Sequence, residues 1–125
     1  MMPRVLVVDD DTLYAEAATA ILDREGRFDV VGRAADGREA VELALALRPD
    51  VVLMDIDMPV MGGLEATRSL RTLLPSARVV VVTSSASDAD RCGARGAGAH
   101  AFLTKGLGSD ALVEATLSAV SEPVR

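Results

Sequence analysis

The sequence has little of what several classes of protein are built from. Aromatic residues make up 2% of the 125 residues and tryptophan is absent, so the core must consist of aliphatic side chains. The single cysteine, Cys92, cannot form an internal disulfide. No apolar run reaches the length of a membrane span or a secretory signal. We therefore expect a chain without disulfides or membrane spans that works in the reducing cytoplasm.

Positive charge is also scarce. Thirteen Lys and Arg residues are outnumbered by 19 Asp and Glu residues, giving a formal net charge of −6 at pH 7. Phosphate backbones are bound by clustered Lys and Arg, so we expect no direct DNA binding by these residues. Apolar residues make up 50% of the chain. This content suits one domain over residues 1–125 that buries about two-thirds of the surface of its unfolded chain.

Short apolar runs alternate with helical patterns along the whole chain. Runs of strand length occur at residues 4–8, 29–32, 50–54, 78–82 and 100–103. Five successive strand-helix units predict an α/β fold, in which a five-stranded parallel sheet carries helices on both faces. The expected strand order is the flavodoxin-like order 2-1-3-4-5.

Five helices are predicted between and after these strands. Four have apolar stripes at helical spacing, which mark the expected core faces: Leu13, Ala17, Ala20 and Ile21; Ala40, Leu43, Ala44 and Leu47; Ala66, Leu70, Leu73 and Leu74; Val113, Thr116, Leu117 and Val120. Asp11 or Thr12 is the expected cap of the first helix, and Asp36 with Glu39 resembles a capping box before the second. The remaining helix, near Asp88–Gly96, is weak because each interior glycine costs roughly 1 kcal/mol relative to alanine.

Acidic side chains follow two of the predicted strands. Asp9 and Asp10 come directly after residues 4–8, and Asp55 comes directly after residues 50–54. In open parallel sheets, ligands bind beyond the carboxyl ends of the strands where the winding direction reverses, here between the first and third strands. Crowded carboxylates repel one another unless a cation neutralises them, and hard oxygen donors favour Mg²⁺ shared with a phosphate. The pattern predicts a magnesium-assisted phosphoryl site.

Two further polar residues are expected at the same edge of the sheet. Thr83 ends the fourth apolar run and Lys105 follows the fifth. A hydroxyl and an ammonium there could bind the oxygens of a transferring phosphoryl group. Taken singly, each residue has an ordinary explanation as a strand-forming threonine, a solvated lysine or a helix-capping aspartate. Their convergence on one edge favours the phosphoryl site.

Four motifs, in order along the chain, resemble the receiver domain of two-component response regulators. They are "VVDDD", "DIDMPVMGG", "VVTSSA" and "GAHAFLTK". The resemblance implies that Asp55 accepts a phosphoryl group from a sensor histidine kinase or a small acyl phosphate. It also implies a signalling domain that catalyses only its own phosphorylation and dephosphorylation, not an enzyme. The stretch "VVGRAADGREAVELALALRPDVVLMDIDMP" is similar to receivers that carry LuxR- or FixJ-type output domains.

The resemblance assigns roles to the remaining site residues. The implied Mg²⁺ ligands are four acidic residues, Asp9, Asp10, Asp55 and Asp57. Of these, Asp9 would act largely through metal-bound water, and Asp57 would contribute its backbone carbonyl. Lys105 would pair with the phosphoryl group. Thr83 and Phe102 would be the switch residues, which change the surface formed by the glycine-containing helix, the fifth strand and the last helix.

Other assignments fit less well. The "DID" of residues 55–57 matches a haloacid-dehalogenase-type phosphatase only locally, because Pro59 lies where that family has Thr or Val. "VVDDDT" lacks the glycine-rich turn of a dinucleotide-binding domain. A receiver that no longer takes phosphate is disfavoured by Asp55, Thr83 and Lys105. We expect a receiver that controls a DNA-binding output domain outside this chain, with a stand-alone receiver acting through protein contacts as the alternative. A homodimer is compatible with both.

Overall fold

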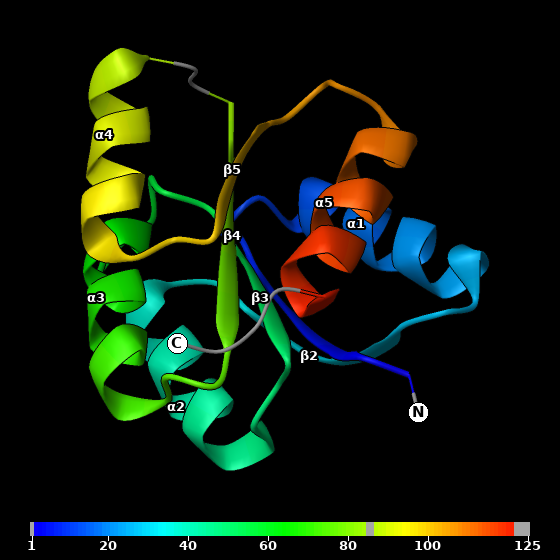
Figure 1. Cartoon of the computed structure of the whole chain (residues 1–125), viewed down its shortest axis with the longest axis horizontal. Coiled ribbons are helices and arrows are strands. Elements are labelled where there is room, and N and C mark those ends of the chain that lie inside the picture. Colours follow the sequence, from blue (N-terminus) through cyan, green and yellow to red (C-terminus); the bar gives the residue numbers. More distant parts are fainter. Residues whose placement is uncertain (1, 85–86, 122–125) are drawn as a thin grey trace.

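Five parallel strands form one sheet in the computed structural model, which describes residues 2–84 and 87–121 (Figure 1). The strands are β1 (Arg4–Val8), β2 (Asp29–Ala34), β3 (Val51–Met54), β4 (Arg78–Thr83) and β5 (Ala101–Thr104). The helices are α1 (Thr12–Glu25), α2 (Gly37–Leu47), α3 (Gly63–Leu73), α4 (Asp88–Ala97) and α5 (Ser109–Ser121). The strand order β2-β1-β3-β4-β5 confirms the predicted fold. Ser85 and Ala86 of the "VVTSSA" motif lie outside the described residues.

Alternate strand residues pack against two helical layers. One set of strand side chains, which includes Leu6 and Val52, faces α2, α3 and α4. The alternate set, which includes Val5 and Val51, faces α1 and α5. Figure 1 shows the sheet nearly edge-on between these layers. Because both faces of the sheet are covered, the central strands β1, β3 and β4 consist mainly of unbroken apolar runs. The sequence therefore located the ends of all five strands to within two residues.

Helix caps follow the sequence signals. The Asp11 carboxylate accepts hydrogen bonds from the backbone N–H groups of the second and third residues of α1, which decides between Asp11 and Thr12. Asp36 accepts from the N–H of Glu39 at 2.8 Å, and the Glu39 carboxylate accepts from the N–H of Ala35 at 2.8 Å. This reciprocal pair confirms the predicted cap of α2.

The predicted core face of α1 is wrong at three of its four residues, and only Ile21 packs against the core. Leu13 is 78% exposed, and Ala17 and Ala20 are also exposed. The residues of α1 buried against the sheet are Ala15, Ala18 and Leu22. An alanine-rich helix offers two stripes of similar hydropathy, and the sheet selects the one that contains Leu22. The other predicted stripes are buried or half-buried, apart from the exposed Leu73.

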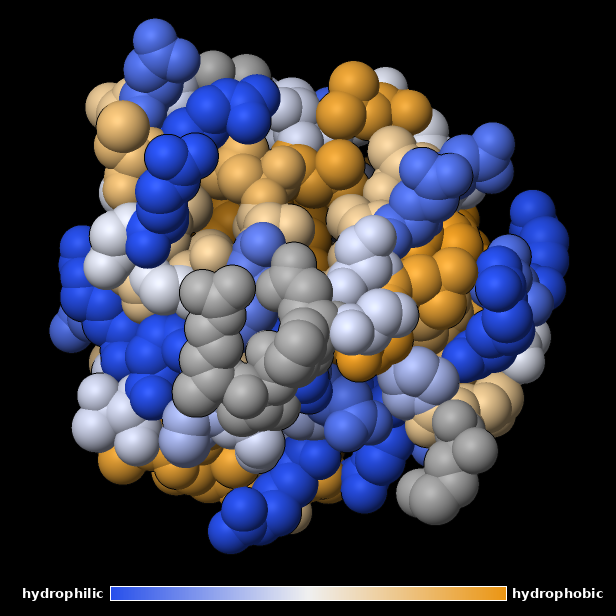
Figure 2. All heavy atoms as spheres, viewed as in Figure 1, coloured by the Kyte–Doolittle hydropathy of each residue, from blue (hydrophilic) through white to orange (hydrophobic). Residues whose placement is uncertain are grey.

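Hydrophobic residues at the surface are dispersed. On the face shown in Figure 2 they form separate patches between hydrophilic side chains. Among the residues that the structure describes, the large exposed hydrophobic ones are Met2, Leu13, Leu45, Val60, Leu73 and Leu107. Within residues 2–84 and 87–121, no helix has both the length and the hydropathy needed to cross a bilayer.

Candidate functional site

The two acidic strand ends lie side by side. β1 and β3 are neighbours in register, with Val8 opposite Met54, so the next residue of each strand leaves the sheet at the same edge. The Asp55 N–H donates to the carbonyl of Val8 at 3.0 Å, and the Asp9 N–H donates to a carbonyl of β2 at 3.0 Å. Both backbones are therefore fixed by the sheet, and the carboxylates start from rigid positions.

Three carboxylates converge at this edge. Asp9, Asp10 and Asp55 each offer an oxygen within 4.8 Å of the other two. Asp9 is 5% and Asp55 is 6% exposed, whereas Asp10 is exposed to solvent. The pKa of Asp55 is raised to about 7, chiefly by burial and then by the charge of Asp9, while the charge of Lys105 opposes both. The group thus consists of hard oxygen donors with excess negative charge, which fits a small divalent cation.

Lys105 supplies positive charge beside these acids. Its Nζ lies 2.7 Å from Asp9 Oδ2 and 3.8 Å from Asp55 Oδ1. Its backbone N–H donates to the carbonyl of Thr83 at 2.7 Å, so β4 fixes the start of the side chain. The structure thus brings Lys105 to the acids from the other end of the chain, as the sequence predicted.

Tyr14 is a site residue that the sequence analysis missed. Its ring centroid lies 4.4 Å from the Nζ of Lys105, and the side chain is half-buried. Burial raises the pKa of Tyr14, and the charges of Asp9 and Asp55 raise it further, so the phenol stays protonated at neutral pH. Its position in the first turn of a helix that starts directly after the acids could have indicated it.

The loop after β3 is tightly held against Asp55. A Cβ on Gly63 would lie 1.8 Å from the backbone oxygen of Asp55, so only glycine fits at this approach. Val60 has a φ of 66°, and the N–H of Met61 donates to the carbonyl two residues back at 2.7 Å. The Met61 carbonyl in turn accepts from the N–H of Gly37 at 2.8 Å. The strained turn is thus anchored to α2 beside the acidic site.

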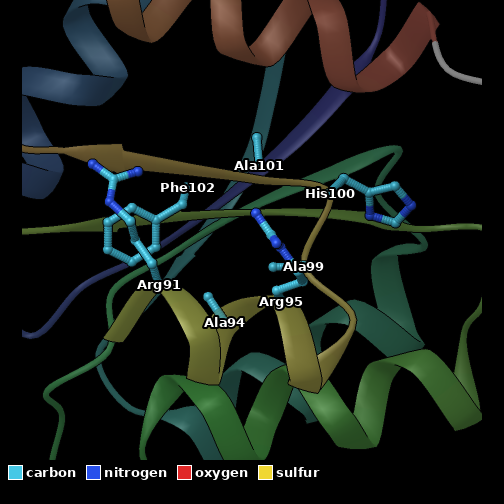
Figure 3. Close-up of a pocket in the computed structure, with 7 residues that line it drawn as sticks. All are labelled: Arg91, Ala94, Arg95, Ala99, His100, Ala101 and Phe102. Atoms are coloured by element: carbon cyan, nitrogen blue, oxygen red, sulfur yellow. The ribbon is translucent and has the colours of Figure 1, made fainter. Parts of the chain in front are cut away.

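The two expected switch residues lie on adjacent strands. Thr83 is buried at the end of β4, and Phe102 is half-buried in β5 and packs against the core beneath α4. The guanidinium of Arg91 lies over the Phe102 ring, 4.8 Å from its centroid (Figure 3). A hollow of about 150 Å³ between α4 and β5 continues from this pair to Arg95 and His100. Phe102 therefore lies between the core and a surface hollow.

The expected residues do not all meet at one point. Among the described residues, Asp9, Asp10 and Asp55 form the metal-competent group, and Lys105 is paired to two of them. The side chain of Asp57 is exposed and lies outside that group. This placement is compatible with the expectation that Asp57 offers only its backbone carbonyl.

A family model described as the response regulator receiver domain matches residues 5–117. The chain belongs to this family. The receiver domain is 47% identical over 115 residues to the response regulator GacA of Pseudomonas aeruginosa, covering 91% of this chain and 53% of GacA. It is 35% identical to the transcriptional regulatory protein LnrK of Bacillus subtilis, covering 94% of this chain and 53% of LnrK. It thus spans about half the length of these curated relatives.

Solved receiver domains have the same fold. The receiver domain of the response regulator NarL from Mycobacterium tuberculosis superposes with a TM-score of 0.94 at 34% identity, covering 98% of both chains. That of CheB from Thermotoga maritima gives a TM-score of 0.91 at 36% identity, covering 98% of this chain and 99% of the other. The family and the fold predicted from the sequence are therefore both confirmed.

Proposed function

We propose that this receiver domain is a phosphorylation-dependent switch whose Asp55 accepts a phosphoryl group from a sensor histidine kinase. The observation that carries the proposal is the placement of one buried carboxylate at a strand end, beside a second carboxylate and a lysine. A nucleophile on a strand end is held still, which suits a transfer that depends on positioning.

The donor set fits Mg²⁺. The carboxylates of Asp9, Asp10 and Asp55, with the backbone carbonyl of Asp57, would hold it. When bound, the ion supplies the positive charge that offsets repulsion between the carboxylates and the incoming phosphoryl group. A solved complex described as CheX–CheY with BeF3 and Mg, from Borrelia burgdorferi, contains a chain 27% identical to this one with a TM-score of 0.89. That relative supports the proposed ion.

The chain's own groups account for the transfer. An Asp55 carboxylate oxygen attacks phosphorus, and the bond from phosphorus to the donor's imidazole nitrogen or acetate oxygen breaks. The electron pair leaves with the donor. Lys105 Nζ, 3.8 Å from Asp55 Oδ1, lies within reach of the oxygens of the transferred group. The acyl phosphate product carries about −1.5 to −2 charge at a buried position, in place of the single negative charge of the Asp55 carboxylate.

The added charge would act on the rest of the domain through Thr83 and Phe102. Attraction of the Thr83 hydroxyl toward the phosphoryl group would open space into which Phe102 can move, changing the surface of α4, β5 and α5. Such a switch needs only a few kcal/mol of differential stabilisation. We assign control of a DNA-binding output domain to this surface because the relatives include a transcriptional regulatory protein of about twice this length. We also place the domain in the cytoplasm. A stand-alone receiver that acts through protein contacts is the alternative, and a homodimer is compatible with both.

The proposal is tested by incubation with acetyl phosphate and Mg²⁺, followed by intact-mass measurement. We expect one phosphoryl adduct that is absent with EDTA and absent in Asp55→Asn. Asp23→Asn, at an exposed aspartate in the last turn of α1, is the matched control and should keep the adduct. An adduct that survives Asp55→Asn would reject the assigned residue. Absence of an adduct with both acetyl phosphate and a phosphorylated cognate kinase would reject the function.

A further inference from the structure

Within residues 2–84 and 87–121, the ammonium of Lys105 has three recorded interaction partners, of which two are acids. It lies 2.7 Å from Asp9 Oδ2, 3.8 Å from Asp55 Oδ1 and 4.4 Å from the ring centroid of Tyr14. The lysine side chain is 16% exposed, so little water competes for it. The aromatic ring is the neutral member of this set.

A closed chain of contacts fixes the ring relative to the acids. The N–H of Asp11 donates to Asp9 Oδ1 at 2.9 Å, and the N–H of Tyr14 donates to Asp11 Oδ1 at 3.3 Å. The ring of Tyr14 faces Lys105 Nζ, and this ammonium forms the ion pair with Asp9 that closes the chain of contacts. The helix cap of α1 therefore fixes the backbone of Tyr14 with respect to the same aspartate that binds the lysine, and the ring lies against the ammonium from there.

The position of a lysine ammonium needs such a restraint because the four-carbon side chain is flexible and the charge is concentrated on one nitrogen atom. Without the ring, the shorter contact to Asp9 would draw the ammonium away from Asp55. Tyr14 also borders a hollow of about 200 Å³ lined by Leu103, Gly106 and Leu107. A smaller side chain at this position would open a path for the ammonium into that space.

We propose that Tyr14 is a positioning residue for phosphoryl transfer, whose ring face holds the Lys105 ammonium between Asp9 and Asp55. The ring attracts the cation electrostatically without neutralising it. The charge of Lys105 thus stays available for the oxygens of the phosphoryl group. This role rests on the proposed function of Asp55.

The first test compares the rates of phosphorylation by acetyl phosphate at fixed Mg²⁺. We expect Tyr14→Leu to slow the reaction about 3- to 10-fold, which is the range of a partly desolvated cation–π contact. Tyr14→Phe keeps the ring face and should retain most of the rate. Leu13→Ala is the matched control, since the neighbouring side chain is 78% exposed. Thermal unfolding of each variant shows whether the fold is intact.

A second measurement reports the position of Lys105 directly. A proton close to a ring face is shifted upfield, so the ε-methylene protons of Lys105 should lose an upfield shift in Tyr14→Leu and keep it in Tyr14→Phe. This spectrum needs neither phosphate nor Mg²⁺. Addition of Tyr14→Leu to Lys105→Met should cause no further slowing, because the ring acts through the lysine.

The outcomes separate the two proposals. Equal rates for the wild type, Tyr14→Leu and Tyr14→Phe, with an Asp55 adduct in each, would overturn the role of Tyr14 and leave the phosphoacceptor in place. Further slowing by Tyr14→Leu in the Lys105→Met background, or an unchanged ε-methylene shift in Tyr14→Leu, would overturn it as well. Absence of an Asp55 adduct in every protein, wild type included, would overturn the proposed function itself.

Discussion

The acidic edge, formed by Asp9, Asp10, Asp55 and Lys105, and the helix α4 differ in how firmly they are held. Asp9 and Asp55 lie on the ends of buried strands, and the loop after Asp55 approaches it so closely that Gly63 has no room for a Cβ. In α4, two of the ten residues are glycine and the buried side chains are Ala94 and Ala97. Few buried apolar atoms connect this helix to the core.

The difference follows from what each region is proposed to do. Charges that repel one another stay close only if the backbone beneath them cannot move. A surface that must respond to a charge has the opposite requirement, because a change in its packing has to cost only a few kcal/mol. The same sheet meets both needs, with rigid strand ends at β1 and β3 and a lightly packed helix beside β5.

Asp55→Asn tests the strain at the acidic edge and should stabilise the domain. Burial raises the pKa of Asp55 from 3.8 to about 7, so folding favours the protonated carboxyl. The stability that this group contributes is present below about pH 4 and is lost as the pH rises to about 7. Without Mg²⁺, we expect the substitution to raise the free energy of unfolding at pH 8 by about 2 kcal/mol, with an upper limit of about 4 kcal/mol.

Urea unfolding of the wild type and Asp55→Asn with EDTA, at pH 8 and pH 4, measures this effect. The variant's increase in the free energy of unfolding should nearly vanish at pH 4. Added Mg²⁺ should reduce the difference between the two proteins at pH 8, because the ion stabilises the wild-type carboxylates. A gain of the same size at both pH values would contradict a buried, strained carboxylate.

Gly63→Ala tests how tightly the loop after β3 packs against Asp55 at the same edge. The new Cβ would lie 1.8 Å from the backbone oxygen of Asp55, so the loop must move away from the strand. We expect a loss of about 2 to 3 kcal/mol in the free energy of unfolding and a reduced rate of phosphorylation. Denaturant titration and the acetyl phosphate assay check both. Unchanged stability would show that the loop is not held as tightly as described.

Gly96→Ala is the matched change in α4 and should act in the opposite direction. A Cβ at Gly96 meets no atom within 4 Å, and the residue lies inside the helix. We expect the free energy of unfolding to rise by about 0.5 to 1 kcal/mol, because alanine loses less conformational entropy on folding than glycine does. Amide exchange should slow across residues 88–97 and stay unchanged near Asp55. Uniformly slow exchange of α4 in the wild type would contradict the contrast between the two regions.

Arg91→Gln has the smallest expected effect on stability. It removes the guanidinium from the Phe102 ring, 4.8 Å away, and also the repulsion between Arg91 and Arg95 one turn apart. These contributions oppose each other, so the free energy of unfolding should change by only about 0.5 kcal/mol or less. The ring resonances of Phe102 should shift, whereas Arg95→Gln should leave them nearly unchanged. Identical shifts in both variants would exclude a specific contact.

Much of the fold was predictable because the buried central strands give short apolar runs, and these alternate regularly with helical patterns along the chain. The expected edge residues Asp9, Asp55 and Lys105 meet as predicted, since the carboxyl ends of parallel strands share one edge. The face of α1 was not predictable. Because the helix is rich in alanine, the stripe that contains Leu13 and the stripe that contains Leu22 are similarly hydrophobic in the sequence. Only contact with the sheet shows that Leu22 is buried and Leu13 is exposed.

The sequence by itself determined the alternation of strands and helices, the cap of α2 and the edge at which the acids gather, because these follow from local periodicity and from residues at strand and helix ends. The tertiary structure decided which stripe of α1 is buried, that Tyr14 faces Lys105 and that Arg91 lies over Phe102. It also decided the raised pKa of Asp55. These properties depend on distances between residues far apart in the chain, and no local pattern encodes those distances.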